Sequence, residues 1–233
     1  MPRRSSAIEV YVETGEKRVF ASALDWPGWC RSGRDRTAAL EALVVYGPRY
    51  AQVVRGTRTS FRQPDGVSEL KVVERLKGDA TTDFGAPGKV PRADARPVDA
   101  RELKRLRVLL EACWSAFDRA AEEAEGIELR TGPRGGGRDL LKIVAHVSSA
   151  EAGYVRRIAA KPPEVDEKDP WSTVDEVRQT ILQAMERAVK DGIPERGPRG
   201  GVMMPLRYFI RRTAWHALDH TWEIEDRSTD PES

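Results

Sequence analysis

Residues 205–226 read PLRYFIRRTAWHALDHTWEIED, and this stretch decides the fold of the C-terminal part of the chain. Its apolar residues recur at the spacing of one helix face, and Pro205 suits a first helical turn. His216 and His220 are four positions apart, so they lie one turn apart on a single face. The same face carries Leu206, Phe209, Ile210, Thr213, Ala217 and Ile224. We therefore expect both imidazoles to point into a helical core.

Three further helices are predicted upstream of this stretch. Asp99 and Glu102 resemble a capping box at the start of one helix, and Thr173 and Glu176 resemble another. With the last helix, the predicted spans are about 99–125, 139–160, 173–191 and 205–226. Four amphipathic helices of this length are enough for an all-α four-helix bundle over residues 99–227.

His146 completes the set of three histidines in the chain, and it belongs to the apolar stripe of the second predicted helix. Three imidazoles aimed at one core are costly if they are charged or unpaired. A divalent metal ion removes that cost by binding a lone pair of each ring, and zinc, nickel and iron all suit such ligands. Three protein ligands also leave a position open, where a water or a thiol would have a lowered pKa. The structural alternative is a set of hydrogen-bonded core histidines without a metal.

The N-terminal segment, residues 7–77, is predicted to be a small α/β domain. Ile8, Val10 and Val12 alternate with polar residues, and a second strand follows the turn at 14–17 to make a hairpin. Thr37 is expected to cap a helix over residues 38–54, which Gly47-Pro48 should divide. Further strand is expected at Phe61 and over residues 67–76. Together with the helices downstream, this predicts the α+β class.

Residues 78–98 are rich in Gly, Pro and small polar residues. Such a composition disfavours both helices and central strands, so an interdomain linker is predicted here.

The composition excludes several classes of function. The 39 basic and 37 acidic residues nearly cancel, which argues against a nucleic-acid binder. Two cysteines are too few for a disulfide framework, so a cytoplasmic protein is expected. No apolar run is long enough to span a bilayer, and no association with membranes is predicted.

Residues 99–227 resemble the DinB superfamily of metal-binding four-helix bundles. The matching residues are the segment Leu141–Val147 with Glu151 and Tyr154, and the segment Trp215–His220. The resemblance implies that His146, His216 and His220 are the metal ligands, and that the protein is a homodimer. Some relatives are transferases that use a low-molecular-weight thiol, and some of those carry Glu at the position of His216.

The N-terminal segment resembles the HicB-like antitoxin domain. The matching residues are Asp25–Cys30, Gly33, and Thr37 with the small and apolar residues at 38–40. Such antitoxins normally carry a separate DNA-binding domain, and nothing in this sequence is typical of one. The segment is then either a module that binds a partner or oligomerises, or a small fold that merely packs on the helices.

Other features carry weaker hypotheses. Two near-identical loops, residues 132–136 and 197–201, combine Gly with Arg before a histidine-bearing helix, and such a loop can hold a carboxylate or phosphate or can simply be a surface loop. Glu151 is either an orienting group or general base for the histidines, or a surface carboxylate. Cys113 is expected to be buried and Cys30 exposed.

These observations predict a metal-dependent enzyme that activates water or a low-molecular-weight thiol for transfer to, or hydrolysis of, a small-molecule substrate. The alternative is a binding or regulatory protein, in which the metal is structural or absent and the N-terminal module engages a partner.

Overall fold

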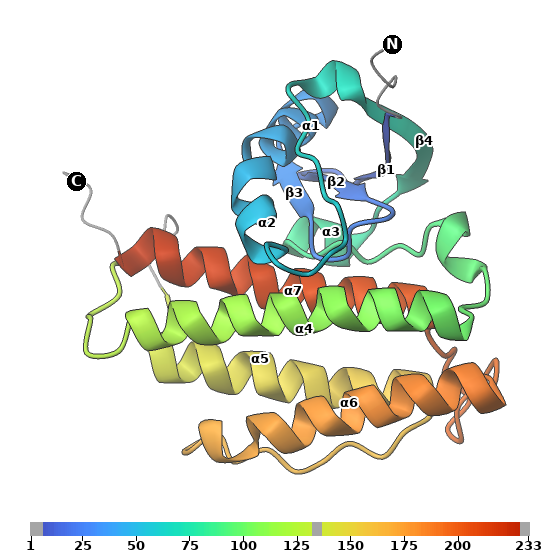
Figure 1. Cartoon of the computed structure of the whole chain (residues 1–233), viewed down its shortest axis with the longest axis vertical. Helices are drawn as coiled ribbons and strands as arrows, with labels where there is room; N and C mark the ends of the chain where they lie inside the picture. Colours follow the sequence, from blue (N-terminus) through green and yellow to red (C-terminus); the bar gives the residue numbers. More distant parts are fainter. Residues whose placement is uncertain (1–6, 132–136, 229–233) are drawn as a thin grey trace. The chain divides into compact units, whose positions relative to one another are not determined.

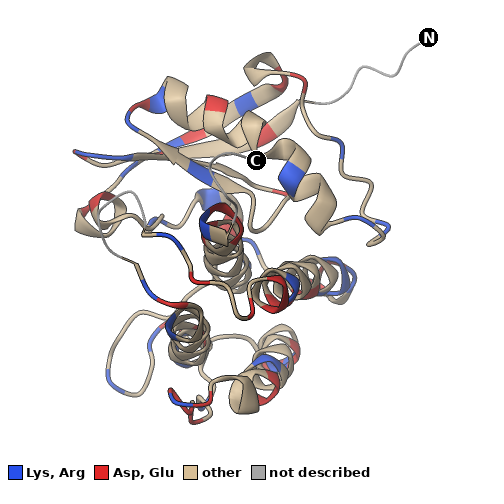
Figure 2. Ribbon diagram, turned by 90° about the vertical axis from the view of Figure 1, so that its left-hand side faces the viewer, with Lys and Arg blue, Asp and Glu red and all other residues tan. Residues whose placement is uncertain are grey.

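The computed structural model describes residues 7–131 and 137–228, and these divide into two compact units with a boundary between Arg96 and Pro97. The first unit combines a sheet with short helices, and the second is helical (Figure 1). The predicted α+β class is therefore confirmed. Lys and Arg occur together with Asp and Glu on all four long helices of the second unit (Figure 2).

The first unit is built on one four-stranded sheet in the order β3-β2-β1-β4. The strands are β1 (Ile8–Thr14), β2 (Val19–Ala23), β3 (Cys30–Gly33) and β4 (Leu70–Lys77). β1 and β2 are antiparallel, with Val10 opposite Ala23, so the predicted hairpin is confirmed. β4 lies on the other side of β1 and runs parallel to it.

Two short helices, α1 (Arg36–Val45) and α2 (Gly47–Val53), follow β3 in the chain. The predicted division at Gly47-Pro48 is confirmed, because proline cannot continue the hydrogen-bonding pattern of α1. The predicted cap is wrong: Asp35 accepts the hydrogen bond from the Ala38 backbone N–H at 2.9 Å, and Thr37 is already inside the helix.

An aromatic cluster forms part of the core of this unit. Trp29 is fully buried, stacks on Tyr50 with ring centroids 5.8 Å apart, and donates its indole N–H to the Leu43 carbonyl. Phe61 packs edge-on against Trp26 at 4.8 Å. Phe61 is therefore a half-buried loop residue that packs on this cluster, and the strand predicted there is not formed.

The segment predicted to be a linker is ordered around a buried carboxylate. Residues 78–96 contain α3 (Ala80–Phe84) and a 3-10 turn, η2 (Arg92–Ala95), so the prediction that no helix forms here is wrong. Glu13 on β1 is fully buried and accepts hydrogen bonds from the Thr82 hydroxyl and the backbone N–H groups of Gly88 and Lys89. These long-range bonds overcome the low helix propensity of the segment, and composition alone does not reveal them.

The second unit is dominated by α4 (Ala100–Glu123), α5 (Leu140–Val155), α6 (Trp171–Asp191) and α7 (Leu206–Ser228). A 3-10 turn, η3 (Arg156–Ile158), extends α5, and another, η1 (Val67–Glu69), precedes β4 in the first unit. Asp99 caps α4 as predicted, by accepting from the Glu102 N–H. Thr173 does not cap α6, because the helix begins at Trp171 and the Thr173 hydroxyl donates to the Pro170 carbonyl.

The four long helices pack along one another, with α4 against α7 and α5 against both α6 and α7 (Figure 1). One apolar cluster draws residues from all four helices, among them Phe117, Val147, Val174 and Ile224. The Glu102 carboxylate also binds the Arg207 guanidinium through both oxygens, which ties the start of α4 to the start of α7.

We predict that Glu13→Gln loosens residues 78–96. The amide NH2 of glutamine would face one of the N–H groups from which Glu13 now accepts a hydrogen bond. That leaves a buried donor unsatisfied and lowers the free energy of unfolding by about 1–3 kcal/mol. Hydrogen exchange of the Gly88 and Lys89 amides should then become faster.

The matched control is Glu41→Gln, the same change at an exposed carboxylate of α1 in the same unit. Equal exchange rates at Gly88 and Lys89 in both variants would show that Glu13 does not hold the segment.

Candidate metal centre

The three histidines of the chain meet between α5 and α7. His146 comes from α5, and His216 and His220 come from successive turns of α7. One ring nitrogen of each residue lies within 4.8 Å of those of the other two, and the ring centroids are 4.7–5.0 Å apart. His216 and His220 are buried and His146 is half-buried.

The spacing of the ring nitrogens is compatible with three ligands around a common ion. The Nε2 atoms of His146 and His216 are 3.2 Å apart. Two nitrogens bound to one tetrahedral ion at about 2.0–2.1 Å are themselves roughly 3.3 Å apart. A shared proton would satisfy only one pair of rings, whereas a cation accepts a lone pair from all three. The donor set therefore fits a divalent metal ion.

Burial keeps two of these rings neutral. It is the largest cause that lowers the pKa of His146, to about 4, and the neighbouring His220 adds to the effect. The pKa of His216 is also held well below its usual value, first by burial and then by His220 and His146. Neutral imidazole is the form that binds metal, so these two rings present free lone pairs at neutral pH.

A carboxylate that the sequence analysis missed fixes the third ring. The Glu223 carboxylate lies 2.7 Å from Nδ1 of His220, which leaves Nε2 of that ring to face the other histidines. The hydrogen bond to His220 is the main cause that lowers the pKa of Glu223, and Arg227 contributes by donating to the other oxygen at 2.8 Å. A carboxylate behind a histidine ligand sets its tautomer and raises its basicity. The signal for it was the spacing, because Glu223 follows His220 by three positions on α7.

Cationic and aromatic side chains surround the three rings. The Tyr154 ring lies 6.0 Å from the His216 ring, and the Arg212 guanidinium lies 4.9 Å from the Trp215 ring. The positive charges of Arg138 and Arg212 both act to lower the pKa of His216, which places them near the centre. In the described part of the chain, the group suited to hold a metal contains three ligands and no fourth His, Cys, Asp or Glu.

Glu151 does not serve the histidines. It lies five positions after His146 on α5, which is a rotation of about 140° around the helix axis. Its carboxylate is buried and accepts a hydrogen bond from the Trp114 indole N–H of α4 at 2.7 Å. Burial is the dominant effect on this carboxyl and raises its pKa to about 7, against the opposing influence of Arg178.

The two cysteines and the two Gly-Arg loops are the remaining candidates from the sequence. Cys113 is fully buried, as predicted, and burial raises the pKa of its thiol. Cys30 was expected to be exposed, but it is also buried and its sulfur is hydrogen-bonded to the Ser22 hydroxyl. Of the two Gly-Arg loops, residues 197–201 are ordered before α7, and residues 132–136 lie outside the described residues.

In comparisons with known proteins, no protein family, no curated protein and no solved structure matches the chain. In the described ranges, every helix is either too short or too polar to cross a membrane.

We predict that Glu151→Gln changes how stability depends on pH. A carboxyl whose pKa is raised by folding is stabilising below its unfolded value of about 4.5 and loses that contribution as the pH rises through about 7. The glutamine of the variant does not ionise, so its stability is not lost as the pH rises. Its side-chain oxygen can still accept the hydrogen bond from the Trp114 indole N–H. It should gain roughly 3 kcal/mol of unfolding free energy relative to wild type between pH 4.5 and 8, measured by urea denaturation.

Glu122→Gln removes an exposed carboxylate of α4 and serves as the control. A difference between wild type and Glu151→Gln that stays constant across this pH range would contradict the buried-acid interpretation.

Proposed function

We propose that the helical unit is a DinB-like four-helix bundle whose His146, His216 and His220 hold one divalent metal ion, such as zinc, nickel or iron. Two kinds of observation support the proposal. The matching residues that motivated the resemblance lie on α5 and α7, where the three rings converge. Burial keeps His146 and His216 neutral, and the contact with Glu223 orients His220.

We further propose that the metal is catalytic. The single observation that carries this proposal is the ligand count, because a structural zinc site is normally closed by four protein ligands whereas a catalytic site keeps one position open. A divalent cation at such a site supplies Lewis acidity that lowers the pKa of a water or a thiol. The proposed reaction is therefore hydrolysis, or transfer of a low-molecular-weight thiol, on a small-molecule substrate.

The residues of this chain have distinct roles in that proposal. Glu223 holds His220 in one tautomer, and Arg227 fixes Glu223 in turn. Arg138 and Arg212 add positive charge near the rings, of which burial keeps His146 and His216 neutral. Such surroundings favour a substrate or a thiolate with negative charge over a cationic one. Tyr154 lies next to His216 and is within 3.4 Å of Nε of Arg212, so it can position a substrate that reaches the rings.

The alternative is a binding or regulatory protein with a structural metal and a HicB-like partner-binding module. The residues that resemble HicB-like domains, Asp25–Cys30 and Thr37–Leu40, lie in the loop before β3 and in α1. The same unit leaves β3 and β4 at the edges of its sheet, and edge strands are common sites of partner binding. A homodimer is proposed for either function.

The first prediction concerns metal content. Protein purified without a His tag should contain about one ion per chain, and His216→Ala should lose it because two imidazoles bind a divalent ion far more weakly than three. Elemental analysis by mass spectrometry measures both. A wild-type chain without stoichiometric metal would overturn the metal site. X-ray absorption that shows a fourth protein ligand would favour the structural alternative.

The second prediction concerns Glu223. Glu223→Gln should weaken metal affinity about 10–100-fold while the three ligands stay in place, because the orienting carboxylate is lost. The control is Glu176→Gln, the same change at an exposed position of α6. Competition with a chelator gives both affinities, and an unchanged value for Glu223→Gln would remove the orienting role.

A thiol-transfer assay with a panel of small thiols separates the two functions. Metal-dependent turnover that is lost in His216→Ala supports the enzyme, whereas stoichiometric metal without turnover on thiols or hydrolysable esters supports the binding protein.

A further inference from the structure

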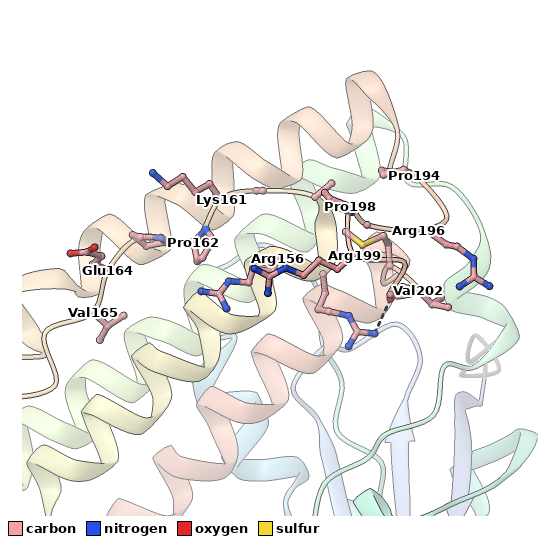
Figure 3. A pocket seen from close by; sticks show the side chains of 17 residues that line it. Arg156, Lys161, Pro162, Glu164, Val165, Pro194, Arg196, Pro198, Arg199 and Val202 are labelled. Atoms are coloured by element: carbon pink, nitrogen blue, oxygen red, sulfur yellow. Dashed lines mark hydrogen bonds between the residues drawn. The ribbon is translucent and has the colours of Figure 1, made fainter.

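A large open cleft lies in the helical unit, where α5 ends and α7 begins. It has a volume of about 1460 Å³ and is lined by η3, the connection that follows it, and the loop before α7 (Figure 3). None of the three histidines lines it. Arg156 follows His146 by ten residues, which corresponds to about 15 Å along a helix, so the cleft is separate from the metal centre.

The lining of the cleft is strongly basic. Five cationic side chains line it, and Glu164 is the one carboxylate residue among its lining residues. The cations are Arg156, Arg157, Lys161, Arg196 and Arg199. None of the five is ion-paired with a carboxylate in the described part of the chain, although elsewhere in this unit Arg178 and Arg207 are paired with acids. Among the lining residues only Glu164 can offset their mutual repulsion, so the lining keeps an excess of positive charge that a bound anion would neutralise.

The cations come from two walls that are joined by hydrogen bonds. Arg156, Arg157 and Lys161 belong to the wall after α5, and Arg196 and Arg199 belong to the loop before α7. The Arg157 guanidinium donates to the Val202 carbonyl at 2.9 Å (Figure 3). The Met204 N–H donates to the Arg157 carbonyl at 2.7 Å. The two walls are thus held together without using Arg156 or Arg199, and both of these reach into the same cleft (Figure 3).

The loop that carries Arg199 is closed on itself. Arg196 and Val202 form an antiparallel bridge, and the Gly197 N–H donates to the Gly201 carbonyl at 2.8 Å. Gly200 has a φ of +77°, a conformation that favours glycine over residues with a side chain. This turn fixes the backbone from which Arg199 extends, which lowers the entropic cost of binding relative to an open loop.

The rest of the lining limits the class of ligand. Prolines and aliphatic side chains supply the apolar contacts, and no aromatic side chain is among the described lining residues. Recognition of a nucleotide base usually includes stacking on an aromatic ring, so the cleft does not favour a nucleobase. Its volume exceeds the roughly 300–1,000 Å³ of typical small-molecule sites, which leaves room for an elongated ligand.

We propose that this cleft is a second ligand site, which binds an organic polyanion whose two or more phosphate or carboxylate groups bridge the two basic walls. One anionic group contacts Arg156 and its neighbours at the end of α5, and another contacts Arg199 in the loop before α7. Arginine forks bind phosphate and carboxylate through paired hydrogen bonds, and the chain between the anionic groups packs against the prolines.

The test is calorimetric titration of the full chain with tripolyphosphate, citrate and acetate as probes. We expect at least about tenfold tighter binding of a multiply charged probe than of acetate, with affinity that falls as salt is added. Comparing tripolyphosphate with citrate distinguishes a phosphate-bearing ligand from a polycarboxylate. The double variant Arg156→Gln with Arg199→Gln should weaken binding of the preferred probe about tenfold or more.

The matched control is Arg119→Gln with Arg187→Gln, which removes the same two charges from exposed positions on α4 and α6. Both double variants retain all three histidines, so binding of a probe to metal affects them equally. Arg156→Lys with Arg199→Lys should keep part of the affinity, because it preserves charge but not the paired geometry. The proposal is overturned if no multiply charged probe binds more tightly than acetate, or if the two glutamine double variants bind equally well.

Discussion

The helical unit depends on one constraint: three imidazole rings meet at one point between α5 and α7, with His216 and His220 buried and His146 half-buried. Two of them are held neutral, since burial lowers the pKa of His146 and His216. The Nε2 atoms of His146 and His216 are 3.2 Å apart, so a hydrogen bond can link this pair but does not include the third ring. A cation can accept a lone pair from each of the three rings, and neutral imidazoles do not repel it. The helices α5 and α7 hold the rings in place.

Two buried carboxylates, Glu13 and Glu151, have different numbers of hydrogen-bond donors around them. Glu13 in the first unit receives three hydrogen bonds, two of them from backbone N–H groups, and so organises a segment of weak intrinsic propensity. Within the described residues, Glu151 in the second unit accepts one hydrogen bond, from the Trp114 indole N–H, and burial raises its pKa. The difference is the number of donors, because each donor offsets part of the cost of removing a carboxylate from water.

The proposed metal centre and the basic cleft lie at different positions along α5 and α7. The histidines lie within α5 and α7, whereas the cleft lies where α5 ends and α7 begins and the chain forms loops. Loops at helix ends can present many long charged side chains without burying them. The cleft can therefore hold a large anion with little effect on the packing that positions the three rings.

Periodicity in the sequence was enough to predict the long helices, the first hairpin and the apolar face on which His146, His216 and His220 lie. These features are local, because a period of 3.6 or 2 residues is set by neighbours along the chain. The tertiary structure alone decided that residues 78–96 fold onto Glu13, that Cys30 is buried, and that Glu151 faces Trp114 while Glu223 supports His220. Each of these outcomes depends on contacts between residues that are distant in sequence or on the exact rotation of a helix, and composition and spacing carry little information about either.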